Sequence, residues 1–271
     1  MIIRHDLKLV FLHVPKCAGK ELRKLFRLGA DEQSIEQLFN YGHSTVLDRY
    51  VDYAHMPLSD LCTTSSFQFL QRYRVVACVR NPYKRLPSAA NEFYRQKSER
   101  HERRVIEGTL TAAMRERYYR KLRLGHSQLD PRFIHSLPMH RFTHLGMEPM
   151  VDHLLHCEQL RDEVVQLSIE LNWPAAMRLA AADLPATDPA PNPQPHERTL
   201  ANELYELDFE WFGYAWDGQG RQPNAQSEET VDAGRVRWIH RAEALAWHWG
   251  PTAKREERRS VPACRENPPV R

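Results

Sequence analysis

Two short apolar runs, each followed by a loop and the start of a helix, constrain the fold most strongly. The first run is Leu7 to His13, and apolar residues recur at helical spacing beyond Gly19. The second run is Arg74 to Val79, after which Asn81 supplies a helix cap and Pro82 a first helical position. Two such units, about 65 residues apart, predict an α/β fold with a central parallel sheet flanked by helices.

The composition is that of one soluble domain with an appendage. The chain has 271 residues and a net charge of +3, from 38 basic and 35 acidic residues. This balance gives no argument for binding nucleic acid. No apolar run approaches the roughly 20 residues of a membrane-spanning helix, and the first residues do not resemble a signal peptide. We therefore expect a cytoplasmic protein, or one that lacks its native targeting segment, without a membrane span.

The cysteines are odd in number and scattered, without a C-x-x-C pair, which favours free thiols in a reducing compartment. They are Cys17, Cys62, Cys78, Cys157 and Cys264.

The second half of the chain contains two further helical patterns and a change of composition. Residues Met150 to Leu171 and Leu200 to Phe212 predict helices, and Ala181 to Pro195 predicts a loop between them. After Trp216 the sequence becomes rich in small polar and charged residues, which places the end of the core domain there.

The predicted core domain is therefore 1–216, and 217–271 is a partly disordered C-terminal extension. Within the extension, residues 235–249 form one amphipathic helical pattern with an apolar face. We expect this face to pack on the domain or on a second copy of the chain, which would make a homodimer.

The first motif is HVPKCAGK at residues 13–20. A loop between a strand and a helix N-terminus presents unpaired N–H groups and the positive end of the helix dipole, and Lys16 adds a cation. This combination suits a phosphate or sulfate ester. A P-loop is the competing interpretation, but its first glycine would fall at Val14 and its Ser or Thr at Glu21. These two mismatches argue against an ATP-using kinase or ATPase.

The second motif is VRNPYKRLPSAANEFY at residues 79–94, in which Arg80 ends a strand and Ser88 lies in the following helix. A guanidinium and a hydroxyl near a helix start make a second anion site. Two such sites on one sheet suit a ligand with phosphate groups at both ends.

Together, the segments PKCAGKE and RNPYKRLPSAA resemble the PAPS-dependent sulfotransferases of family 2, the group that contains carbohydrate sulfotransferases such as heparan sulfate 2-O-sulfotransferase. VDHLLHCEQLR at 151–161 is similar to a later family segment, and LYELDFEWFGY at 204–214 is similar to a C-terminal one. The resemblance implies a sheet like that of P-loop kinases, PAPS as donor, adenosine 3′,5′-bisphosphate as product and no metal.

The resemblance also implies roles for individual residues. Lys16 would bind the phosphosulfate bridge and stabilise the leaving group, and Gly19 would let the backbone approach it. Arg80 and Ser88 would bind the 3′-phosphate. The implied donor-binding residues are Pro15, Lys16, Cys17, Ala18, Gly19, Lys20, Arg80 and Ser88.

Three residues depart from the family pattern. Lys20 and Glu21 stand where the family has Thr or Ser, so a hydroxyl contact to the 5′-phosphate is lost. Pro87 falls inside the predicted helix, where it should kink the backbone. These departures keep open an alternative, a nucleotide-binding relative with little or no catalysis.

A histidine is the expected base for removing the proton of the acceptor hydroxyl. His55 is favoured because the family often carries a catalytic "GH" segment before the second motif, and Arg80 follows 25 residues later. His43, in the sequence YGHSTV, is the runner-up.

Two other clusters have weaker functional interpretations. His140 with His144, and His153 with His156 and Cys157, have spacings that could suit a metal, but the accompanying HExxH pattern is missing, and we expect no metal site. Residues 95–123 hold ten Lys or Arg against four Glu, which fits either a solvated helix face or a rim for an acidic acceptor. The expected acceptor is a carbohydrate hydroxyl first, and a peptide tyrosine or a small alcohol or phenol second.

Overall fold

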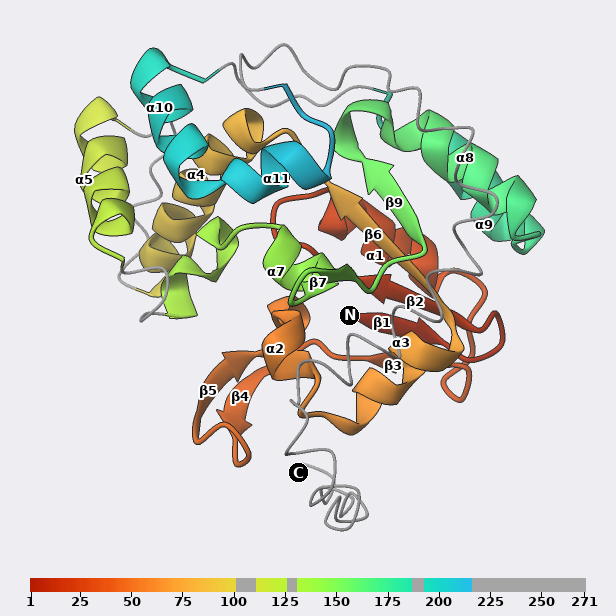
Figure 1. The fold of residues 1–271 in the computed structure, drawn as a ribbon. Helices are drawn as coiled ribbons and strands as arrows, with labels where there is room; N and C mark the ends of the chain where they lie inside the picture. Colours follow the sequence, from red (N-terminus) through yellow and green to blue (C-terminus); the bar gives the residue numbers. More distant parts are fainter. Residues whose placement is uncertain (101–110, 126–130, 187–192, 216–271) are drawn as a thin grey trace.

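A computed structural model describes residues 1–100, 111–125, 131–186 and 193–215 of the chain. The described residues form a central sheet with helices around it (Figure 1). The sheet order is β3–β1–β2–β6–β9, with β1 (Ile2–Arg4), β2 (Leu9–Leu12), β3 (Ile35–Gln37), β6 (Arg74–Val79) and β9 (His153–His156). Two hairpins stand apart from it: β4 (Tyr41–Ser44) with β5 (Arg49–Asp52), and β7 (His144–Leu145) with β8 (Glu148–Pro149).

The α/β class is confirmed, and the sheet is mixed rather than wholly parallel. Strands β2, β6 and β9 run parallel, whereas β1 is antiparallel to both β2 and β3. Only a short turn connects β1 to β2, and a connection of that length allows only an antiparallel pair. The carboxyl ends of the three parallel strands therefore lie at one edge of the sheet.

Helices cover the sheet and its edges. They are α1 (Gly19–Arg27), α2 (Leu58–Leu61), α3 (Gln68–Arg72), α4 (Pro82–Arg100), α5 (Ala112–Arg123), α7 (His140–Thr143), α8 (Leu160–Glu170), α9 (Ala175–Ala182), α10 (Pro195–Leu204) and α11 (Glu206–Trp211). Short 3-10 helices are η1 (Tyr53–His55), η2 (Ser65–Phe67), η3 (Pro131–Ser136) and η4 (Cys157–Gln159). In Figure 1, α4, α5, α10 and α11 gather on the left, and α8 and α9 on the right.

Both strand–loop–helix units predicted from the sequence are confirmed. The first is β2 followed by α1, and the second is β6 followed by α4. Asn81 caps α4 as expected, because its side-chain oxygen accepts a hydrogen bond from the N–H of Tyr83 at 3.0 Å. The helix continues through Pro87 to Arg100, so this proline does not end it.

The predictions for the second half need correction. Residues Met150 to Leu171 are not one helix, because His153–His156 extend the sheet as β9, paired with the buried strand β6, before α8 begins. Helix α9 runs into the predicted loop as far as Ala182. The helix expected at Leu200–Phe212 is two helices, α10 and α11, which meet at the fully buried Tyr205.

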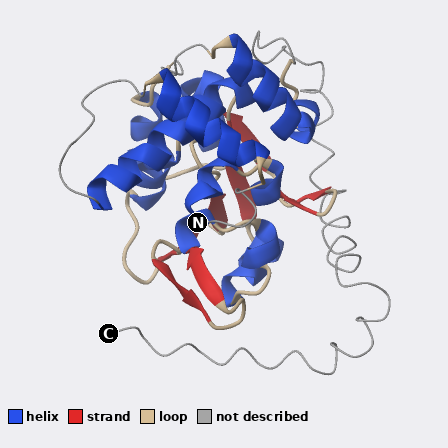
Figure 2. Ribbon diagram, turned by 90° about the vertical axis from the view of Figure 1, so that its left-hand side faces the viewer, coloured by secondary structure: helices blue, strands red, loops and turns tan. Residues whose placement is uncertain are grey.

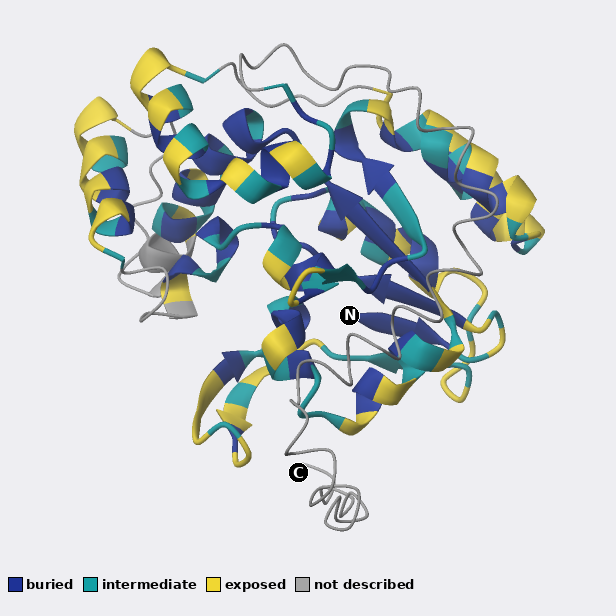
Figure 3. Cartoon of the chain, viewed as in Figure 1, coloured by how far each residue is buried: buried dark blue, intermediate teal, exposed yellow. Residues whose placement is uncertain are grey.

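The core lies between the sheet and the helices, and Figure 3 shows the sheet strands as the most buried part of the molecule. Four cysteines are described, and all four are free thiols, as predicted. Among the described residues, no helix is long and apolar enough to cross a membrane. Residues 217–271, with the predicted helix at 235–249 and the homodimer that rests on it, lie outside the described residues.

Candidate active site

The loop between β2 and α1 has the backbone of an anion-binding turn. Lys16 and Ala18 both adopt left-handed conformations, with φ of 65° and 52°. Non-glycine residues pay about 1–2 kcal/mol for such a conformation, so this loop is strained. Backbone strain of this kind gathers at functional sites. Turns of this type aim successive N–H groups into one concave surface.

The N–H groups at the start of α1 remain available for a ligand. In the part of the chain that the structure describes, no group accepts a hydrogen bond from the N–H of Ala18, Gly19 or Lys20. The next two N–H groups bond the carbonyl of Ala18 at 3.1 and 3.0 Å. The positive end of the helix dipole reinforces this site, so the predicted donor loop has the geometry that an anionic ester needs.

Gly19 is required by a neighbouring side chain. A Cβ atom at Gly19 would lie 1.7 Å from Nε2 of His13, so any larger residue would collide with the imidazole ring. The sequence prediction assigned this glycine to close approach by a ligand. The structure adds a packing reason, because the ring of His13 fills the space next to the Cα atom of Gly19.

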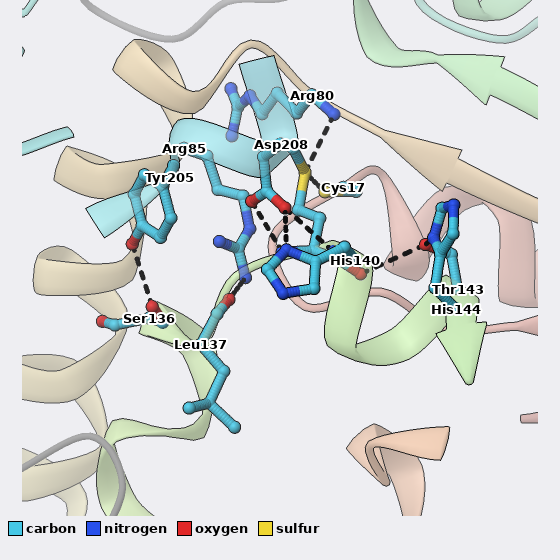
Figure 4. Close-up of polar contacts among 11 residues, drawn as sticks. Cys17, Arg80, Arg85, Ser136, Leu137, His140, Thr143, His144, Tyr205 and Asp208 are labelled. Atoms are coloured by element: carbon cyan, nitrogen blue, oxygen red, sulfur yellow. Dashed lines mark hydrogen bonds and ion pairs between the residues drawn. The ribbon is translucent and has the colours of Figure 1, made fainter. Parts of the chain in front are cut away.

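Two arginines at the start of α4 bind carbonyl groups of the donor loop. Arg85 is fully buried, and it donates to the carbonyl oxygen of Pro15 at 3.0 Å and to that of Leu137 at 2.7 Å (Figure 4). Arg80 donates from Nη1 to the carbonyl oxygen of Lys16 at 3.2 Å. Sequence reasoning assigned Arg80 to the 3′-phosphate and gave Arg85 no role. The position of Arg85 within the motif RNPYKRL was a signal that could have identified this role.

The C-terminal segments resembling the family serve as anchors for this edge of the sheet. Asp208 accepts hydrogen bonds from the N–H groups of Met139 and His140 at 2.7 and 2.9 Å. Met139 in turn contacts the thiol of Cys17 at 3.6 Å and the N–H of Arg80 at 3.4 Å, so it lies between the two motifs (Figure 4).

Glu158, in the segment predicted at 151–161, has a similar anchoring role. Its carboxylate accepts hydrogen bonds from the N–H of Asn81 at 2.8 Å and from the hydroxyl of Tyr214 at 3.0 Å. The later segments therefore hold the two motif loops in place.

His55 has the partner that a base requires. Its Nδ1 lies 2.7 Å from Oδ2 of Asp52, whose other oxygen accepts the N–H of Ala54 at 3.0 Å. Burial alone would raise the pKa of Asp52, but the hydrogen bond and charge of His55 hold it below its usual value. An ionised carboxylate only accepts hydrogen bonds, so Nδ1 donates and Nε2 is left as the basic nitrogen.

Two further histidines surround His55. The ring centroids of His13 and His135 lie 4.4 and 4.9 Å from that of His55. Burial lowers the pKa of His135 to about 3 and that of His13 well below its usual value, so both are neutral near pH 7. Nδ1 of each ring is buried without a hydrogen-bond partner among the described residues.

Lys16 pairs with an acidic residue of α4 that sequence reasoning missed. Its Nζ lies 3.1 Å from Oε2 of Glu92, and Arg95 contacts both oxygens of the same carboxylate. Burial opposes ionisation of Glu92, but the contacts of Arg95 and Lys16 lower its pKa to about 2.

His135 connects the two charged pairs. Its ring centroid lies 4.9 Å from that of His55, and the charges of His55, Asp52, Glu92 and Lys16 all influence its pKa. His55 and Lys16, 39 residues apart in the sequence, thus both act electrostatically on His135. His43 lies instead in the β4–β5 hairpin, with Nε2 3.7 Å from Oδ1 of Asp48.

The other sequence features have ordinary structural partners. Glu21 pairs with Lys24 at 3.4 Å, and Ser88 is half-buried in α4. In the predicted basic stretch, Arg115 pairs with Glu197 at 3.3 Å, and Arg95 with Glu92. No group of three possible metal ligands occurs within the described ranges. The histidines of the two spaced clusters have protein partners: His140 lies 2.9 Å from Asp208, His144 2.8 Å from Thr143, and His156 3.1 Å from Glu163.

Comparison with known proteins identifies the family. The model of the sulfotransferase family matches residues 1–154, more than half of the 271 residues. The matched region contains the donor loop, the RNPYKRL motif, Asp52, His55 and Glu92. Comparisons with curated proteins and with solved structures gave no match. The chain therefore belongs to the sulfotransferase family.

Proposed function

We propose that this protein transfers a sulfuryl group from PAPS to a hydroxyl group of a carbohydrate. In this reaction the acceptor oxygen forms a bond to sulfur, and the bond between sulfur and the 5′-phosphate oxygen breaks. The products are a sulfate ester, adenosine 3′,5′-bisphosphate and one proton. The region between Lys16 and His55 supports the proposal most strongly, because it combines a cation for the leaving group with an oriented base.

Each residue of this region has a definite role in the proposal. Lys16 and the free N–H groups of α1 stabilise the negative charge that grows on the leaving phosphate oxygen. His55 accepts the acceptor's proton at Nε2, and Asp52 holds the ring in the required orientation and stabilises the imidazolium. His135 remains neutral near pH 7 because burial lowers its pKa to about 3. Arg80 and Ser88 bind the 3′-phosphate.

The hairpin that leads into His55 supports a carbohydrate acceptor. In its register Tyr41 is opposite Asp52 and His43 is opposite Tyr50, so all four side chains lie on one face of the hairpin. Tyr41 and Tyr50 are 52% and 59% exposed, and their rings are stacked 5.9 Å apart. Exposed tyrosines offer flat apolar surfaces with hydrogen-bonding tips, which suits the apolar face and hydroxyl groups of a sugar.

Two alternatives remain, an inactive nucleotide-binding relative and an enzyme acting on tyrosine or a small phenol. The first rests on Lys20, Glu21 and Pro87. Two observations oppose it: Glu21 is paired with Lys24, and α4 continues through Pro87. The second would use the same aromatic face to stack a phenol ring.

The test is incubation of the chain with PAPS labelled in its sulfuryl group and with separate pools of glycans, tyrosine peptides and phenols. We expect the label to move to glycans and adenosine 3′,5′-bisphosphate to appear in equal amount. If the label moved only to peptides or only to phenols, the acceptor would belong to that class and not to the carbohydrates. Tight binding of adenosine 3′,5′-bisphosphate without transfer to any pool would favour the inactive relative.

A further inference from the structure

The ion pair between Lys16 and Glu92 joins the donor loop to the middle of α4. The side chains of Lys16 and Glu92 are only 23% and 13% exposed, so solvent screens this pair less than a surface pair. The Glu92 carboxylate is also held by Arg95, one turn further along the helix. The lysine proposed to touch the leaving group is therefore held by a protein carboxylate.

The same face of α4 carries the residue proposed for the other end of the donor. Ser88, Glu92 and Arg95 are spaced i, i+4 and i+7, which places them on one side of a helix. Helix α4 would thus present a hydroxyl to the 3′-phosphate and a carboxylate to the lysine at the 5′ end. This arrangement gives one helix a contact with both ends of the nucleotide.

A carboxylate at this position competes with the donor. The phosphosulfate is an anion that needs the same ammonium group, and Glu92 stays ionised because the pKa of its carboxyl is lowered to about 2. Protonation therefore cannot release Lys16 near neutral pH. The donor has to displace Glu92 from Lys16, and Arg95 remains to balance the displaced carboxylate.

We propose that Glu92 is a positioning residue, which holds the ammonium group of Lys16 in the donor-free protein and is exchanged for the donor's 5′ group on binding. The proposal rests on the proposed function, because it needs a nucleotide donor that Lys16 contacts. It predicts a direction that a stabilising contact would not give: removing the charge of Glu92 should tighten nucleotide binding.

The test is a double-mutant cycle with adenosine 3′,5′-bisphosphate as the probe and calorimetry as the readout. We expect Glu92→Gln to lower the dissociation constant about tenfold, a coupling typical of residues in contact. In a Lys16→Ala background the same substitution should have no effect, because the exchange needs the ammonium group. Glu92→Asp keeps the charge and should bind the nucleotide nearly as the wild type does.

Glu21→Gln is the matched control for general charge repulsion. It removes an acidic charge from the first turn of α1, where Glu21 pairs with Lys24 rather than with Lys16. If Glu21→Gln and Glu92→Gln tighten binding equally, or if the effect of Glu92→Gln persists without Lys16, the exchange is overturned while the proposed function stands. If the wild-type chain does not bind adenosine 3′,5′-bisphosphate at all, both proposals fail together.

Discussion

The two sides of the candidate site are built in different ways. The donor side is a strained loop whose carbonyl groups are held by Arg80 and by the fully buried Arg85. The proposed acceptor side is the β4–β5 hairpin, which projects from the body in Figure 1 and lies at the lower end of the molecule in Figure 2. Val51 is 3% exposed on one face, whereas Tyr50 is 59% exposed on the other.

This difference suggests that one side of the site suits a nucleotide and the other an acceptor. A nucleotide that always has the same shape can be bound by a buried, preorganised edge of the sheet. An acceptor that extends into solvent needs an open surface next to the base. Asp52 belongs to both sides, because it ends the hairpin and fixes the ring of His55.

Removal of the proposed base should have the largest effect, because His55 lies where the two sides of the site meet. His55→Ala should lower the rate of transfer about 10²–10⁴-fold, because no positioned nitrogen then takes the acceptor's proton. Affinity for adenosine 3′,5′-bisphosphate should stay near that of the wild type. Asp52→Asn should also lower the rate, because the ring loses the ionised acceptor that orients Nδ1 and stabilises the imidazolium.

His43→Ala is the control for this experiment, since His43 is the alternative base and lies on the hairpin. If His43→Ala loses the activity and His55→Ala keeps it, the base is His43. Loss of nucleotide binding in His55→Ala would instead place His55 on the donor side.

Arg85→Ala tests whether the buried guanidinium of Arg85 holds the proposed donor loop in place. The carbonyl groups of Pro15 and Leu137 would each lose a buried donor, and an unsatisfied buried polar group costs about 1–3 kcal/mol. We expect the free energy of unfolding to fall by about 3 kcal/mol in urea denaturation, together with weaker nucleotide binding. Arg80→Ala, at a half-buried position, should cost less stability. A loss below about 1 kcal/mol for Arg85→Ala would mean that the donor side is not preorganised by this contact.

The buried imidazole of His135 makes acid stability a further probe of the region between the two sides. Its pKa is about 3 in the folded protein, against about 6.5 in an unfolded chain. Between these values the unfolded state binds more protons, so stability falls as the pH falls, by up to about 1.4 kcal/mol per pH unit. His135→Gln should reduce the loss of unfolding free energy between pH 7 and pH 5.

The exposed His43 supplies the matched control for this pH dependence, with a side chain that is 45% exposed. His43→Gln should leave the pH dependence as in the wild type. An unchanged slope in His135→Gln would mean that the ring is hydrated and titrates normally. His13, which is also buried, is expected to contribute in the same direction as His135.

The sequence predicted the strands and helices around the proposed donor loop well because their signals are local. The loop, β6, the Asn81 cap and the start of α4 each depend on neighbouring residues, and short-range patterns record such features directly. The strand β9 was missed because its pairing with β6 outweighs the helical spacing of Met150–Leu171. Tertiary pairing of this kind has no local signature.

The remaining residues of the site could be found only in part. Asp52 lies three residues before His55, and this spacing was a readable signal for an acid–histidine pair. Glu92 and His135 have no such signal, because 76 and 119 residues separate them from Lys16 along the chain. The fold alone brings them together at the carboxyl edge of the sheet.

The smallest expected effect concerns the aromatic face of the hairpin. Tyr41→Ala with Tyr50→Ala should raise the acceptor's KM about tenfold, because each aromatic contact contributes about 0.5–1.5 kcal/mol beyond its area. The donor's KM and the melting temperature should hardly change, since both rings are more than half exposed. Val46→Ala, which is 70% exposed near the hairpin turn, should behave as the wild type. If the double variant loses donor binding instead, the hairpin supports the donor side and the two sides of the site are not independent. If neither KM changes, the acceptor approaches His55 from another direction.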